Sequence, residues 1–245
     1  MTFKAAVRAG LRRTLLIPNG VCPVCGKVLF RTPEYLCGRC LGELPLMTMK
    51  ACACCGRPVN MEDGIYCAAC TMATRRVFSG GYVWLHYRDG AKKLVAALKF
   101  GGRPVLGFWI GRQMAARMAD MSWITKIEGI IPVPLHPRRL ETRGYNQSAF
   151  LAQGMGEALG LPVLEEALIR YADTPHQLGL SRRQRMKNLS AAFVVKDEAA
   201  VAGKNLLLAD DVITTGSTLR ECAETLLAAG ARSVYTAVVA AAPGD

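Results

Sequence analysis

Two adjacent carboxylates, Asp210 and Asp211, follow four apolar residues in the stretch LLLADDVITTGST, residues 206–218. Hydroxyl side chains and one glycine come next, just before an amphipathic helical pattern. Carboxylates suit diol hydroxyls or a Mg²⁺ ion, and hydroxyls beside the free N–H groups of a helix start suit a phosphate. A phosphate, a diol and a metal ion together describe a sugar phosphate. We therefore expect a sugar-phosphate site formed by Asp210, Asp211, Thr214, Thr215, Gly216, Ser217 and Thr218.

The surrounding elements must place this site at one edge of a sheet. The apolar run before Asp210 does not alternate, which predicts a buried parallel strand. Similar short runs occur at residues 129–133, 193–195 and 233–242, with helical patterns between them. The sequence therefore predicts an α/β fold with a doubly wound parallel sheet, whose ligand lies at the carboxyl ends of the strands. The alternating aromatic stretch 77–87 predicts a strand or a hairpin.

The stretch 206–218 also resembles the phosphoribosyl-pyrophosphate (PRPP) loop of type I phosphoribosyltransferases. This resemblance implies that Asp210 and Asp211 are catalytic residues that hold the ribose 2′ and 3′ hydroxyls. It implies that residues 214–218 surround the 5′ phosphate, and that Mg²⁺ binds together with PRPP.

A basic segment, LHPRRLETRGYNQS, spans residues 135–148 between the predicted strand 129–133 and a predicted helix at 148–159. A basic loop at the carboxyl end of a strand belongs on the ligand face of an open α/β sheet. Type I phosphoribosyltransferases have their pyrophosphate loop at this place. The resemblance therefore implies that pyrophosphate is held by Arg138, Arg139, Arg143 and Gln147.

A polar segment at residues 169–192 resembles the flexible catalytic loop of the same enzymes, with Gln177 and Arg185 as its candidate residues. Such a lid excludes water and brings cations to the leaving pyrophosphate. The alternative is a basic surface loop without a catalytic role.

The N-terminal part contains a repeat of Cys-x2-Cys-Gly-x10-Cys-x2-Cys with a constant offset of 30 residues. Two C-x-x-C turns complete a tetrahedral Cys₄ site, so the repeat predicts a double zinc ribbon with two structural Zn²⁺ ions. Each ion could use one repeat, or the repeats could cross. Disulfides would need an oxidising compartment, and the sequence has no export signal. The predicted ligands are Cys22, Cys25, Cys37, Cys40, Cys52, Cys55, Cys67 and Cys70.

These features divide the chain into an N-terminal helix with a double zinc ribbon, residues 1–75, and a phosphoribosyltransferase-like domain, residues 76–245. No uninterrupted apolar run reaches the length of a transmembrane helix, and the start does not have the pattern of a secretory signal. We expect a cytoplasmic protein. A peripheral position of its Arg-rich first helix on the inner face of the membrane remains an alternative.

The segment PVPLHPRRLETRGYNQS, taken with the CPVCG pattern, resembles the ComF (ComFC/GntX-like) family. That family joins zinc ribbons to a phosphoribosyltransferase-like domain and is associated with DNA uptake in natural transformation. The resemblance therefore implies a role in competence, with other competence proteins as candidate partners. The oligomeric state stays open.

Three functions fit these features. The first is Mg²⁺-dependent phosphoribosyl transfer to an unknown acceptor, since no residue set specifies a purine, a pyrimidine or an amine. The second is non-catalytic binding of single-stranded DNA, with PRPP or a nucleotide phosphate in the sugar-phosphate pocket. The net charge of +12 favours this function. The third is a PRPP-sensing regulator that acts through its ribbons.

Overall fold

The computed structural model describes residues 20–30, 32, 34–59, 64–171 and 192–242. No helix in these ranges is both long enough and apolar enough to cross a membrane.

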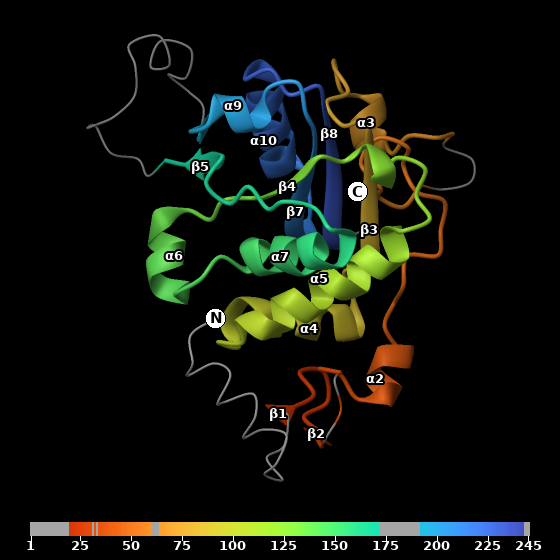
Figure 1. Ribbon diagram of the computed structural model, residues 1–245. Coiled ribbons are helices and arrows are strands. Elements are labelled where there is room, and N and C mark those ends of the chain that lie inside the picture. The colour runs from red at the N-terminus through yellow and green to blue at the C-terminus, as the bar shows by residue number, and fades with distance from the viewer. Residues whose placement is uncertain (1–19, 31, 33, 60–63, 172–191, 243–245) are drawn as a thin grey trace.

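A four-stranded parallel sheet forms the centre of the protein (Figure 1). Its strands, in spatial order, are β3 (Gly80–His86), β8 (Ser233–Ala241), β7 (Asn205–Ile213) and β4 (Gly129–Pro132). All three neighbouring pairs are parallel, as is usual where crossover connections contain helices. The α/β fold with a parallel sheet that the sequence predicts is therefore confirmed.

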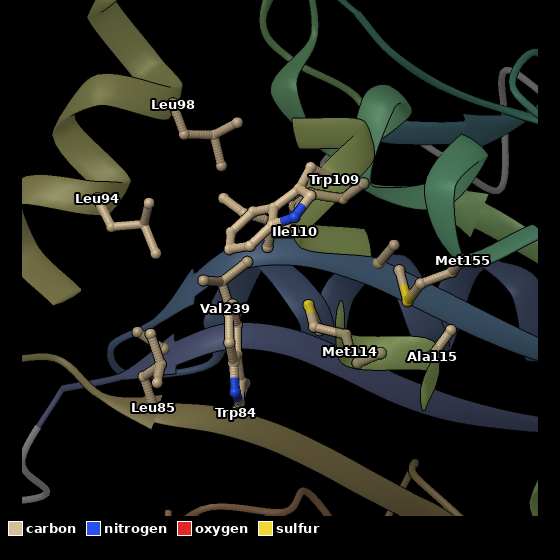
Figure 2. Packing of buried hydrophobic residues seen from close by; sticks show 14 of the residues in the cluster. Trp84, Leu85, Leu94, Leu98, Trp109, Ile110, Met114, Ala115, Met155 and Val239 are labelled. Atoms are coloured by element: carbon tan, nitrogen blue, oxygen red, sulfur yellow. The ribbon is translucent and has the colours of Figure 1, made fainter. Parts of the chain in front are cut away.

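Helices cover both faces of this sheet. One face carries α4 (Asp89–Phe100), α5 (Pro104–Met118) and α7 (Gln147–Leu159), and the other carries α10 (Ser217–Ala228). Alternate residues of β7 divide accordingly, because successive side chains of a strand point to opposite faces: Leu207 packs on the first side and Leu208 on the second. Figure 2 shows the first core, where Trp84 and Val239 of the sheet lie beneath Ile110 of α5.

The predicted strand at residues 193–195 lies outside the parallel sheet, so its assignment to that sheet was wrong. It forms β6 (Phe193–Val195), which pairs antiparallel with β5 (Leu168–Arg170) in a separate two-stranded sheet. The fourth strand of the main sheet is β3 instead. The alternating aromatic stretch at residues 77–87 predicts it only as a strand or a hairpin. β3 pairs over most of its length with β8, whereas β6 has only three residues to pair.

The shorter helices are η1 (Ile124–Lys126), α6 (Pro137–Arg143) and α9 (Glu198–Val201). α6 falls inside the basic segment that the sequence indicates as a loop. Proline stands at its first turn and Gly144 ends it in the left-handed conformation. These are favourable start and stop residues, and the His136 side chain accepts a hydrogen bond from the Arg138 N–H at the start of the helix.

The two ribbons contribute to the hydrophobic cores on opposite sides of the sheet. The first contains β1 (Gly20–Val21), β2 (Val28–Leu29) and α2 (Gly38–Gly42), and three of its cysteines share a core with α4 and α5. The second contains α3 (Ala68–Thr71), and its cysteines share a core with α10. In Figure 1 the first ribbon lies at the bottom of the view and α3 at the top.

Candidate functional site

The segment that follows β7 has the strand–turn–helix geometry that the sequence predicts. β7 continues to Ile213, so Asp210 and Asp211 lie within the strand, and α10 begins at Ser217. Gly216 precedes the helix with a φ of +81°, a conformation that glycine adopts without steric cost. The first N–H groups of α10 have no partner within the helix, which makes this turn suitable for an anion.

The two carboxylates have different surroundings. Asp211 is buried, forms an ion pair of 2.8 Å with Lys99 Nζ, and accepts a hydrogen bond of 2.6 Å from Gln147 Nε2. Asp210 Oδ1 accepts hydrogen bonds from Ser148 Oγ at 3.1 Å and from the Asp211 N–H at 2.8 Å. Burial, and then the charge of Asp211, raises the pKa of Asp210 to about 7. Lys99 thus neutralises Asp211, while Asp210 is near its titration point at neutral pH.

A cavity of about 280 Å³ joins these carboxylates to the basic segment. Arg139, Arg143 and Gln147 line it together with Asp210, Asp211, Thr214 and Thr218. Gln147 links the two sides, because its Nε2 donates to Asp211 while its Oε1 accepts from Arg143 Nη1. Arg138 is exposed on α6 and is not among the cavity's lining residues. The structure therefore brings three of the four predicted pyrophosphate-loop residues to the carboxylates.

Lys99 and Arg170 also line the cavity, and sequence reasoning did not identify them. Lys99 comes from the last turn of α4, where it reads as an ordinary residue of an amphipathic helix. Arg170 comes from β5, and its guanidinium lies 5.2 Å from the centre of the Phe193 ring. Its Nε is buried and has no hydrogen-bond partner among the described residues. Both cations reach the site from distant segments, so no local pattern indicates them. The predicted lid residues Gln177 and Arg185 lie outside the described residues.

The eight predicted zinc ligands form two Cys₄ clusters, and each cluster uses one repeat. Cys25 Sγ lies 3.7 Å from Cys37 Sγ, and Cys55 Sγ lies 3.6 Å from Cys67 Sγ. Tetrahedral zinc with Zn–S bonds of about 2.3 Å requires sulfur atoms about 3.7 Å apart, so both clusters fit the ion. Hydrogen bonding, chiefly from the Lys27 backbone, lowers the pKa of Cys25 to about 6, which favours the thiolate. The chain thus has two sites for structural zinc, one in each repeat.

Comparisons with known proteins agree with this architecture. A family model described as a double zinc ribbon domain matches residues 13–71, and one described as a phosphoribosyl transferase domain matches residues 158–245. A structure of glutamine PRPP amidotransferase from B. subtilis is 20% identical, with a TM-score of 0.38, and the match covers 61% of this chain and 27% of that one. The two family models together define the class of the protein, a double zinc ribbon joined to a phosphoribosyltransferase domain.

Two curated relatives match nearly the whole chain. Competence protein F of Haemophilus influenzae is 33% identical over an alignment of 226 residues, and the match covers 88% of each chain. DNA utilization protein YhgH of Escherichia coli O157:H7 is 32% identical over an alignment of 218 residues, and the match covers 88% of this chain and 87% of that protein. The chain therefore belongs to the competence protein F (ComF) family.

Proposed function

We propose that the protein binds PRPP together with Mg²⁺ in the cavity between β7, α6 and α7. It would then transfer the phosphoribosyl group of PRPP to an acceptor, as part of a role in DNA utilization. The observation that carries this proposal is the meeting of the Asp210–Asp211 pair, the turn before α10 and two arginines of α6 in one cavity. The names of the relatives support the link to competence and DNA utilization. A cytoplasmic location fits the proposal.

Each end of the ligand would have its own set of groups. The carboxylate of Asp210 would accept hydrogen bonds from a ribose hydroxyl, and the turn 214–218 would hold the 5′ phosphate with N–H and hydroxyl donors. Arg139 and Arg143 would hold the pyrophosphate, since one guanidinium group can donate two parallel hydrogen bonds to the oxygens of a phosphate. Arg170 also lines the cavity and adds a third guanidinium to it.

The reaction would replace the C1′–pyrophosphate bond with a bond to the acceptor. Holding the ribose and the leaving group fixed lowers the barrier by positioning, and nearby cations stabilise the charge that develops on the pyrophosphate. The carboxylate and hydroxyl oxygens of the cavity suit Mg²⁺, which prefers such donors and phosphate oxygens. When bound, the ion would neutralise part of the pyrophosphate charge.

Calorimetry with PRPP, with and without Mg²⁺, tests the proposal. We expect Mg²⁺-dependent binding by the unsubstituted protein and its loss in Asp210→Asn/Asp211→Asn. Asp120→Asn, at an exposed position, is the matched control and should bind normally. Release of pyrophosphate in the presence of candidate acceptors then reports turnover. A folded, zinc-loaded protein that does not bind PRPP would overturn the proposal.

Non-catalytic binding of single-stranded DNA is the second candidate. It is favoured by the net charge of +12 and by the exposed Arg138 beside the cavity. Binding through the phosphate backbone weakens steeply as salt rises, because counterions are released from the nucleic acid. A titration with single-stranded DNA at several salt concentrations separates this candidate. No binding at low salt would remove it, whereas a steep slope without pyrophosphate release would favour it over transfer.

A further inference from the structure

Arg57 is a buried arginine whose charge has no ion-pair partner in the part of the chain that the structure describes. It follows Cys55 and Gly56 in the second ribbon, and only 7% of it is exposed. Neither Nε nor Nη2 has a hydrogen-bond partner among the residues that the structure describes. A buried guanidinium without an acceptor is costly, and native proteins rarely leave such donors unsatisfied. A bound ligand would supply the missing acceptor.

The guanidinium lies against the turn before α10. A Cβ atom placed on Gly216 would lie 3.1 Å from Arg57 Nη2. Gly216 is the residue that precedes α10, and its backbone has a φ of +81°. The arginine therefore lies at the N-terminal end of a helix of 12 residues, which carries a partial positive charge itself. Two positive groups side by side favour an anion that contacts both of them.

The zinc turn of the second ribbon fixes the position of Arg57. The Arg57 carbonyl accepts a hydrogen bond of 2.7 Å from the Cys52 N–H, and the Cys52 carbonyl accepts one of 2.9 Å from the Gly56 N–H. A Cβ on Gly56 would lie 2.6 Å from the Gly81 carbonyl carbon, so the turn touches the backbone of β3 directly. The backbone of Arg57 is thus held on one side by the zinc ligands and on the other by the sheet.

We propose that Arg57 is a phosphate ligand that the second zinc ribbon supplies to the turn 214–218, where it binds the phosphate monoester end of a sugar phosphate. This inference rests on the proposed function and adds a specific residue to it. Arginine suits this task because its planar group donates two parallel hydrogen bonds to one phosphate. Arg57 reaches the turn from the ribbon, whereas Arg139 and Arg143 come from α6.

The first ribbon contains a natural control. Lys27 has the same place in the first repeat that Arg57 has in the second, and it is exposed. The residue before it, Gly26, has the same φ of +74° as Gly56, but a Cβ there would meet nothing within 4 Å. Lys27→Gln therefore removes one cation from the equivalent position of a ribbon without touching the turn before α10.

Titration of the full-length, zinc-loaded protein with ribose 5-phosphate tests the inference. We expect Arg57→Gln to weaken binding about 10- to 100-fold, the usual effect of losing charge-assisted hydrogen bonds, and Lys27→Gln to leave it within about 2-fold, as expected for an exposed charge. Arg57→Lys keeps the charge and should bind with intermediate affinity. Ribose without phosphate should bind equally to all four proteins.

The stability of the Arg57→Gln protein shows whether Arg57 serves to bind phosphate or to stabilise the fold. Without ligand, we expect Arg57→Gln to unfold at the same or a higher urea concentration than the unsubstituted protein, because it removes an unpaired buried charge. A structural arginine would show the opposite change. If Arg57→Gln does not fold, Arg57→Lys carries the same test of affinity.

The outcomes distinguish this inference from the proposed function. Undiminished binding of ribose 5-phosphate by Arg57→Gln, with Mg²⁺-dependent PRPP binding still lost in Asp210→Asn/Asp211→Asn, would overturn the role of Arg57 alone. A folded, unsubstituted protein that binds neither PRPP nor ribose 5-phosphate would overturn both.

Discussion

The two zinc ribbons have the same cysteine spacing but different surroundings. Cys25 is exposed in the first ribbon, whereas its counterpart Cys55 is only 2% exposed in the second. The first ribbon is joined to α5 by a hydrogen bond of 2.9 Å from Trp109 Nε1 to Glu34, and the second touches the sheet backbone at Gly81. A repeated sequence thus reproduces the zinc chemistry, while the surroundings of each copy determine what else it does.

Loss of zinc from one ribbon at a time has the largest expected effect. Cys52→Ser/Cys55→Ser should abolish ribose 5-phosphate binding and strongly destabilise the core beneath α10, because a structural zinc contributes on the order of 10 kcal/mol to folding. Cys22→Ser/Cys25→Ser should also lose one zinc ion but keep the phosphate site. Zinc content, urea unfolding and titration with ribose 5-phosphate measure these effects. Equal loss of binding in both variants would show that the ribbons do not differ in this respect.

Much of the zinc-ribbon architecture was predictable because its signals are local. The ligand spacing alone indicates two Cys₄ sites. It leaves open whether the repeats cross, and the structure shows that each cluster uses one repeat. The turn between β7 and α10 is equally local, since an apolar strand, Gly216 and the start of a helix follow one another in the chain.

The contacts between distant segments were not predictable. Asp211 pairs with Lys99, 112 residues away in the sequence, and no periodicity connects the two. The short strand β6 was assigned to the wrong sheet because three apolar residues do not specify a partner. In the sequence Arg57 is one of many basic residues, and only the fold shows that it is buried beside Gly216.

Substituting alanine for Gly26 and for Gly56, the equivalent glycines of the two ribbons, should give the next largest difference in the free energy of unfolding. Both have a φ of +74°, so each Gly→Ala change should cost about 1 kcal/mol for the left-handed conformation. Gly56→Ala should cost about 3 kcal/mol more, because its new Cβ would collide with the Gly81 backbone. It should also weaken ribose 5-phosphate binding by displacing Arg57. Urea unfolding at constant zinc measures the first effect, and similar midpoints for both variants would contradict the close packing of the second ribbon.

Asp210 and Asp211 are also one residue type in two different environments. Substituting them should change the free energy of unfolding less than the changes in the ribbons do. The pKa of Asp210 is raised to about 7 by burial and by the charge of Asp211, so the folded state binds more protons than the unfolded state between about pH 4 and pH 7. The stability that this protonation contributes is present below pH 4 and is lost as the pH rises through 7. Asp210→Asn should therefore stabilise the protein, and the gain should grow by about 1 kcal/mol between pH 6 and pH 8.

Asp211→Asn is the matched control, and it should destabilise the protein because it leaves Lys99 without its ion-pair partner. Urea unfolding of both variants at the two pH values measures the difference. Both variants should bind PRPP poorly, so Asp210→Asn would gain stability while it loses affinity. A stabilising effect that does not change with pH would mean that Asp210 keeps one protonation state between pH 6 and pH 8. If that state is the carboxylate, the hydrogen bonds that it accepts from Ser148 and the Asp211 N–H hold its pKa below this range.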